Sequence, residues 1–133
     1  MYLFINNLLE QKTKSALIQK NGQVIEKSLL NKKGRKGANI LKGIDNILSS
    51  QNLALKDISG IIVVSGPGPF STIRKVLSIG NTIGWCQDIP VVGVSSSDNL
   101  NEKGLIKQGV DKIKEKKGFH MALPFYGKEP NIS

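Results

Sequence analysis

Short apolar runs and turn signals alternate along the beginning of the chain. Residues 2–5 form an uninterrupted apolar run of strand length. Residues 15–27 hold two strand-like runs around Asn21-Gly22, a dipeptide that accepts positive φ at both central positions of a hairpin turn. The pattern predicts one strand followed by a β-hairpin, with a basic segment, residues 31–36, after it.

The middle of the chain changes between helical and strand periodicity. In residues 37–50 and 70–86, apolar side chains recur at three- and four-residue spacings, as on one face of a helix. Residues 60–64 and 90–94 are short apolar runs rich in β-branched residues, which favour strands buried on both faces. Two such strands joined by a helix are expected to be parallel, with a right-handed crossover.

The last part of the chain predicts a weaker helix and an apolar tail. Residues 105–117 have one apolar and one charged side, and Gly118 stands where a C-terminal cap is expected. Residues 119–126 should pack along a sheet edge, where Pro124 is tolerated. The order β-β-β-α-β-α-β with a small helical appendage predicts an α/β fold. A ribonuclease-H-like, mixed five-stranded sheet has this order.

The composition excludes several classes of protein. The 133 residues suit one domain, and the 39% of hydrophobic residues suit one core. The longest uncharged stretch is too short to span a bilayer, and no signal peptide is visible, so we expect a cytoplasmic protein that does not associate with a membrane. With only Cys86 and His120, an internal disulfide and a His/Cys metal site are excluded. We expect structural roles for both residues, with Cys86 buried, and no catalytic residue, metal or cofactor.

The net charge of +9 raises the question of a polyanionic partner. Residues 1–59 hold ten basic and four acidic residues. Two interpretations stay open: ordinary solvated lysines, or a contact with RNA or an acidic protein. The scarcity of arginine disfavours the reading of bases. The candidates for an RNA contact are Lys32, Lys33, Arg35 and Lys36.

The loop Gly66-Pro67-Gly68-Pro69 has the look of a phosphate-binding loop but lacks its chemistry. A phosphate cradle needs several consecutive N–H donors, and proline has none. No Gly-Lys-Ser/Thr follows, as a Walker A loop requires. A structural turn is the preferred interpretation, with an anion site or a partner contact as alternatives.

The same loop carries a family resemblance. Residues 66–74, GPGPFSTIR, resemble the Gly-Pro-Gly-Ser-Phe-Thr-Gly-Leu-Arg signature of the TsaB (YeaZ) family. Residues 89–96 are similar to that family's Ile-Pro-(apolar)₂-Gly-Val-Ser-Ser strand, and order and spacing agree over residues 1–97. Residues 124–130 resemble its closing Pro-x-Tyr-x-Arg segment, with Lys128 in place of arginine.

The resemblance implies a fold and a function. The fold would be one lobe of the actin/Hsp70/sugar-kinase type in residues 1–97, with a short helix and tail, residues 98–133, in place of the second lobe. The function would be that of a non-catalytic partner of TsaD, which transfers threonylcarbamoyl to the adenosine 3′ of the anticodon in certain tRNAs. TsaE, an ATPase, would complete the assembly. This chain would contact tRNA either indirectly, through its partners, or directly through the basic residues named above. A basic RNA-binding module without a TsaD role is the alternative.

The resemblance also implies an interface and a homodimer in isolation. In this family, helices of the first lobe make the dimer contact, and residues 37–50 and 70–86 correspond to them. The interface residues expected here are Ile40, Ile44, Ile47, Ile73, Arg74, Leu77, Gly80, Ile83 and Gly84. Gly80 and Gly84 allow close packing either on the sheet or across a helix–helix seam.

Single positions carry further expectations. Asn6-Asn7 stands where the family usually has Asp-Thr, and an amide cannot supply the charge of a Mg²⁺–phosphate site, so nucleotide binding is not expected. Phe70, at the end of the Gly66–Gly68 turn, is expected to anchor the core, with a role as a binding group as the alternative. Arg74 is expected either to bind local carbonyls or a carboxylate such as Asp57 or Asp98, or to contact a partner.

Overall fold

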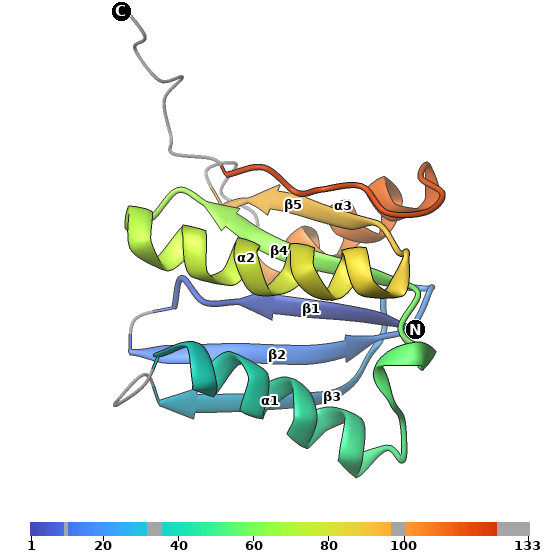
Figure 1. Ribbon diagram of the computed structural model, residues 1–133, viewed down its shortest axis with the longest axis horizontal. Helices are drawn as coiled ribbons and strands as arrows, with labels where there is room; N and C mark the ends of the chain where they lie inside the picture. The colour runs from blue at the N-terminus through green and yellow to red at the C-terminus, as the bar shows by residue number, and fades with distance from the viewer. Residues whose placement is uncertain (10, 32–35, 97–100, 125–133) are drawn as a thin grey trace, which may run out of the picture.

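A mixed five-stranded sheet forms the centre of the molecule (Figure 1). The computed structural model describes residues 1–9, 11–31, 36–96 and 101–124, apart from the side chains of residues 36–38. The strands are β1 (Tyr2–Asn6), β2 (Lys12–Ile18), β3 (Val24–Asn31), β4 (Gly60–Gly66) and β5 (Val91–Ser95), in the order β3-β2-β1-β4-β5. β1–β2 and β2–β3 pair antiparallel, whereas β1–β4 and β4–β5 pair parallel. This is the ribonuclease-H-like sheet that the hydrophobic pattern predicts.

The hairpin that joins β2 to β3 forms where Asn21-Gly22 predicts it. Gly22 has φ of +93°, a conformation that glycine adopts without steric cost. Its N–H donates to the carbonyl of Gln19 at 2.8 Å. The resulting register places Ala16 opposite Lys27, so these two side chains share one face of the sheet.

Two helices, α1 (Lys36–Ser50) and α2 (Phe70–Gln87), lie on one face of the sheet (Figure 1). They bury their apolar sides against alternate residues of β1, β2, β4 and β5 in one continuous core. From the helices this core includes Ile40, Ile44, Ile47, Ile73 and Leu77, and from the strands it includes Leu3, Leu17 and Val63. The apolar periodicity of both helices is therefore the signature of packing within the chain.

A third helix, α3 (Glu102–Lys114), covers the opposite face of the sheet. Its buried side chains are Leu105, Ile106, Val110 and Ile113, which pack in a second core that includes Phe4, Ile62 and Val64. Asn101 caps its N-terminus by accepting from the Gly104 N–H at 2.9 Å. The short 3₁₀ helix η1 (Leu55–Asp57) precedes β4. Both faces of the sheet are thus covered. The domain boundary expected at residue 97 stays a prediction.

The segment after α3 returns along the free side of β5. The Val91 N–H donates to the carbonyl of His120 at 2.9 Å, and Pro90 and His120 form a parallel bridge. The predicted packing along a sheet edge is confirmed for the described residues, 119–124. Gly118 does not cap α3, because the helix ends at Lys114, and it instead turns the chain with φ of +69°.

No helix in the described part of the chain is both long enough and apolar enough to cross a bilayer.

Candidate partner-binding face

The loop between β4 and α2 is held by its neighbours on two sides. Gly66 ends β4 with φ of +138°, a value that requires glycine, and the Gly66–Pro67 peptide bond is cis. The carbonyl of Gly66 accepts from the Ser96 hydroxyl at 3.3 Å. At Gly68, a Cβ would lie 2.8 Å from Leu8 Cδ2, so this glycine allows the loop to pack against the segment after β1. The loop is a structural turn that sets where α2 begins.

Phe70 is exposed, which corrects its expected role as a core anchor. It is the first residue of α2 and keeps 58% of its surface accessible. α2 begins beyond the carboxyl end of β4 (Figure 1). Phe70 shares the helical spacing of the buried Ile73 and Leu77 but is not part of the core that they enter.

Arg74 lies one turn further along α2 and stacks on Phe70. Its Cζ atom is 5.2 Å from the centroid of the Phe70 ring, within the range of a cation–π contact. Of the carboxylates considered for it, Asp57 accepts from the Ala54 N–H at 2.8 Å, and Asp98 lies outside the described residues. The stacked pair lines a shallow groove of about 420 Å³ together with Ser71, Lys75, Ser78 and Ile79.

Most of the residues expected at a partner interface lie in the chain's own core. Ile40, Ile44, Ile47, Ile73, Leu77, Gly80 and Gly84 are buried. A Cβ on Gly80 would lie 3.0 Å from Val63 Cγ2, and one on Gly84 would lie 2.2 Å from Val91 Cγ2. The two glycines therefore serve close packing on the sheet, and these seven residues cannot touch a partner while the lobe is intact. Of the expected set, Arg74 is exposed and Ile83 is half-buried.

Both α1 and α2 also carry large apolar residues that are exposed. Leu41 on α1 is 52% exposed and Trp85 on α2 is 70% exposed. Between Arg74 and Trp85, the outward positions of α2 are the small residues Ser78 and Thr82. We call the surface formed by Leu41, Phe70, Arg74 and Trp85 the helical face. Arg74 is also in the interface set expected from the sequence, and Phe70 shares the spacing of the buried stripe, whereas Trp85 falls off that stripe.

The carboxyl ends of β1 and β4 carry amides and hydroxyls. The Leu8 N–H donates to Asn6 Oδ1 at 3.0 Å, and the Thr13 hydroxyl donates to the Asn7 amide oxygen. The buried Ser65 hydroxyl donates to the Val94 carbonyl at 3.4 Å. Among the described residues, no three His, Cys, Asp or Glu side chains are grouped so as to hold a metal ion. These polar groups serve the local backbone and each other.

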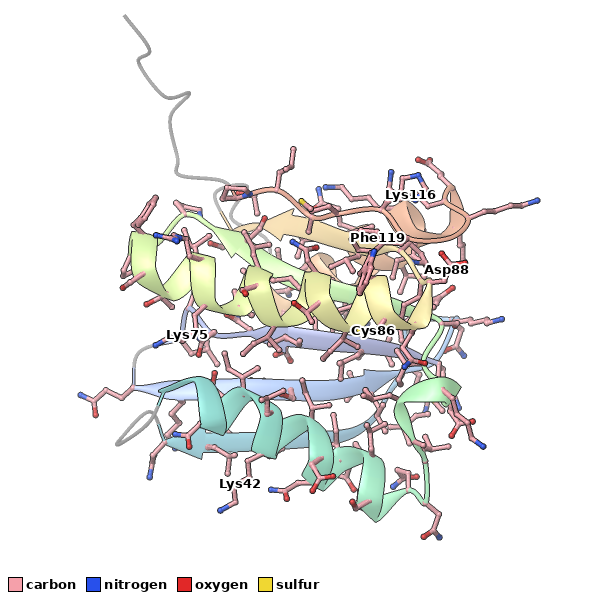
Figure 2. The ribbon with its side chains drawn as sticks, in the orientation of Figure 1. Lys42, Lys75, Cys86, Asp88, Lys116 and Phe119 are labelled. Carbon is pink, nitrogen blue, oxygen red and sulfur yellow. The ribbon has the colours of Figure 1, made fainter. Side chains whose placement is uncertain are left out.

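The remaining residues singled out in the sequence are the basic residues at 32–36, Cys86 and His120. Lys32, Lys33 and Arg35 lie outside the described residues, as does the side chain of Lys36, the first residue of α1. Cys86 is exposed, contrary to expectation (Figure 2). Gly84 occupies the inner side of α2 at that end, and a residue two positions later points about 200° away. His120 is exposed and contributes its backbone carbonyl to the sheet edge.

Comparisons with known proteins identify the family of the chain. The family model described as TsaD, tRNA N6-adenosine threonylcarbamoyltransferase, matches residues 34–114, which is more than half of the chain. The tRNA threonylcarbamoyladenosine biosynthesis protein TsaB of Bacillus subtilis (strain 168) is 31% identical over 64 residues, which are 48% of this chain and 28% of that protein. The chain belongs to the TsaB/YeaZ branch of this family.

Solved YeaZ structures share the fold of the lobe. YeaZ from Pseudomonas aeruginosa superposes with a TM-score of 0.62 at 19% identity, over 71% of this chain and 43% of that one. A structure described as an uncharacterized protein with similarity to peptidase YEAZ from Pseudomonas aeruginosa gives 0.63 at 19% identity, over 71% and 42%. The chain thus spans less than half the length of these relatives, and it corresponds to one lobe of the YeaZ fold.

Proposed function

We propose that this chain is a non-catalytic, TsaB-type subunit that binds a TsaD-type subunit and supports threonylcarbamoyl transfer to the adenosine 3′ of the tRNA anticodon. A TsaE-type ATPase is the further partner in this proposal, and the complex is cytoplasmic. The choice of this reaction rests on the TsaB relative, which is named for threonylcarbamoyladenosine biosynthesis.

The structure of the 66–74 motif is the observation that carries the proposal. The glycines and prolines of the motif form a turn that packs against neighbouring segments. Phe70 and Arg74, which follow this turn, lie on the surface rather than in the core. Aromatic residues and arginine are enriched at protein interfaces, and arginine is also enriched among the residues that contribute most of the binding energy. We therefore assign the partner contact to the helical face and not to the buried stripe beneath it.

The same face is the proposed site of a homodimer when no TsaD-type subunit is present. Leu41 and Trp85 are large, exposed apolar side chains, and their transfer out of water into an interface is favourable. A second copy of this chain can cover them in isolation, and a TsaD-type subunit would then displace that copy.

The absence of catalysis by this subunit is part of the proposal. At the carboxyl end of β1, Asn6 and Asn7 offer amides, which are engaged with Leu8 and Thr13. Ionised carboxylates are the groups that Mg²⁺–phosphate sites use. These contacts support a scaffold rather than a nucleotide-using enzyme.

The test is complex formation with the TsaD-type subunit from the same source, followed by light scattering after size exclusion. We expect the natural chain to form a complex at micromolar concentrations. Leu41→Asp and Phe70→Asp should each weaken it at least tenfold, because a carboxylate in a closed apolar interface loses its hydration.

Leu29→Asp is the matched control. Leu29 is 50% exposed, close to the value for Leu41, but it lies on the opposite face of the sheet, opposite Lys14 of β2. It should leave the complex intact. A complex that tolerates Leu41→Asp and Phe70→Asp but not Leu29→Asp would mean that the interface lies on the α3 side of the sheet and not on the helical face. The absence of any complex would refute the proposed function.

A further inference from the structure

A second surface, on the far side of the sheet from the helical face, gathers lysines from separate parts of the chain. A groove of about 310 Å³ runs between α3 and the β2–β3 hairpin. Lys103, Lys107 and Lys114 of α3 line one side, and Asn21 and Gly22 of the hairpin line the other. All three lysines are exposed. Their spacing of four and seven residues keeps them on one side of the helix along roughly 16 Å of its length.

The neighbouring strands add to this charge. Lys14 shares its sheet face with α3, because it pairs with Glu102 at 2.5 Å. Alternation along β2 puts Lys12 on that face too, and the register puts Lys27 there opposite Ala16. We call these six lysines, Lys12, Lys14, Lys27, Lys103, Lys107 and Lys114, the lysine groove.

The acidic residues at this surface offset only part of the charge. Glu102 is engaged by Lys14, and Asp111 lines the groove between Lys107 and Lys114. Six lysines against these two carboxylates leave the described part of the surface clearly positive. A concave surface of one sign concentrates its field and attracts a polyanion.

The lining of the groove distinguishes between polyanions. Between α3 and the hairpin, the apolar member of the lining, Val110, is buried, and the exposed Leu29 on the same sheet face lies outside this lining, so the groove between α3 and the hairpin gives no aliphatic anchor to an amphipathic acidic helix or a lipid chain. It contains neither an aromatic ring for stacking a base nor an arginine for reading one. It does present ammonium groups and an asparagine amide, which suit phosphate oxygens.

We infer that the lysine groove binds the phosphate backbone of a structured RNA without reading its sequence. None of the six lysines belongs to the basic segment at residues 31–36, and this surface lies on the face that the proposed TsaD contact leaves open. The choice of tRNA as the biological ligand rests on the proposed function, whereas the preference for an RNA backbone rests on the groove alone.

Fluorescence anisotropy of the chain alone, with labelled tRNA and with an unrelated RNA hairpin at several KCl concentrations, tests the inference. We compare the triple variant Lys103→Gln/Lys107→Gln/Lys114→Gln with Lys42→Gln/Lys56→Gln/Lys75→Gln, which removes the same charge from α1, η1 and α2. Figure 2 shows Lys42 and Lys75 on those helices. The groove variant should bind both RNAs about tenfold or more weakly, with a salt slope smaller by about 2 to 3, since each lost phosphate contact lowers it by about 1.

The other outcomes overturn the inference. Equal weakening by both triple variants would mean that only net charge matters. Loss confined to Lys32→Gln/Lys33→Gln/Lys36→Gln would move the site to the basic segment. Anionic lipid vesicles that bind through the groove lysines as tightly as RNA would remove the RNA assignment. Because no TsaD-type subunit is present, these results are independent of the proposed complex.

Discussion

Gly109 sets how closely α3 approaches the sheet. A Cβ at this position would lie 2.4 Å from Cγ2 of Ile62, a side chain with no exposed surface. Contacts this short do not occur, so either the helix or Ile62 would have to move. The absence of a side chain at Gly109 is therefore what allows Leu105, Ile106 and Val110 to reach the core.

We predict that Gly109→Ala destabilises the chain despite the better helix propensity of alanine. Alanine contributes about 1 kcal/mol in a helix interior, whereas overpacking a closed core costs about 1 to 3 kcal/mol. Urea denaturation should show a net loss of about 1 kcal/mol. The companion variant Ile62→Ala removes the three Ile62 atoms nearest to that Cβ.

A double-mutant cycle identifies the cause. If the clash is responsible, Gly109→Ala should cost less in the Ile62→Ala background than in the natural chain. Independent, additive effects of the two substitutions would show that Gly109 is needed for some other reason. Lys107→Ala, an exposed change on the same helix, should be close to neutral.

The outcome at single residues shows what a periodic pattern can and cannot predict. The spacing of Ile40, Ile44 and Ile47 correctly identifies an apolar stripe on a helix, but spacing does not say whether that stripe meets a sheet or a partner. Phe70 has the same spacing but is the first residue of α2 and is exposed. The ends of elements in space, which decide such cases, are not written in the local sequence.

At the scale of elements, α2 holds the segment after α3 against the lobe. The Asn81 amide donates to the carbonyl of Ala122 at 3.0 Å and accepts from its N–H at 2.8 Å, as a neighbouring strand would. At the end of the helix, Asp88 accepts from the Phe119 N–H at 3.1 Å (Figure 2). This segment is thus fixed by Asn81 of α2 and by Asp88, which follows α2, as well as by the bridge to β5.

We predict that Asn81→Ala releases this segment. Both backbone groups of the buried Ala122 would lose their partners, which costs about 1 to 2 kcal/mol when the two hydrogen bonds are counted together. Amide hydrogen exchange at Ala122 should accelerate at least tenfold, while exchange in β1 should change less. Asn46→Ala, an exposed change on α1, is the control, and unchanged exchange at Ala122 would contradict the role of Asn81.

The order of the elements was predictable where each one carries its own signal. The β-branched run at residues 60–64 and the dipeptide Asn21-Gly22 correctly place a buried strand and a hairpin. The side-chain clasp of Asn81 and the groove between α3 and the hairpin join residues that are 41 or more positions apart. No local pattern indicates such contacts, so the lysine groove emerges only from the fold.

At the scale of the whole molecule, α3 completes a lobe that corresponds to less than half of its YeaZ relatives. Without α3, the side of the sheet that includes Phe4, Ile62 and Val64 would face water. The four buried apolar side chains of α3 contribute about 6 to 12 kcal/mol at about 1.5 to 3 kcal/mol each. A domain of this size has a net stability of only about 5 to 15 kcal/mol.

We therefore predict that a chain ending at residue 100 does not fold, whereas a chain ending at residue 124 does. The shorter chain should lose its cooperative urea transition, bind the dye ANS and aggregate on size exclusion. The longer chain keeps every described residue and should unfold in a single transition. A cooperative transition in the shorter chain would mean that α1, α2 and the sheet suffice for the lobe. α3 would then serve mainly to carry the lysine groove, and Gly109→Ala should leave the stability of the rest of the lobe almost unchanged.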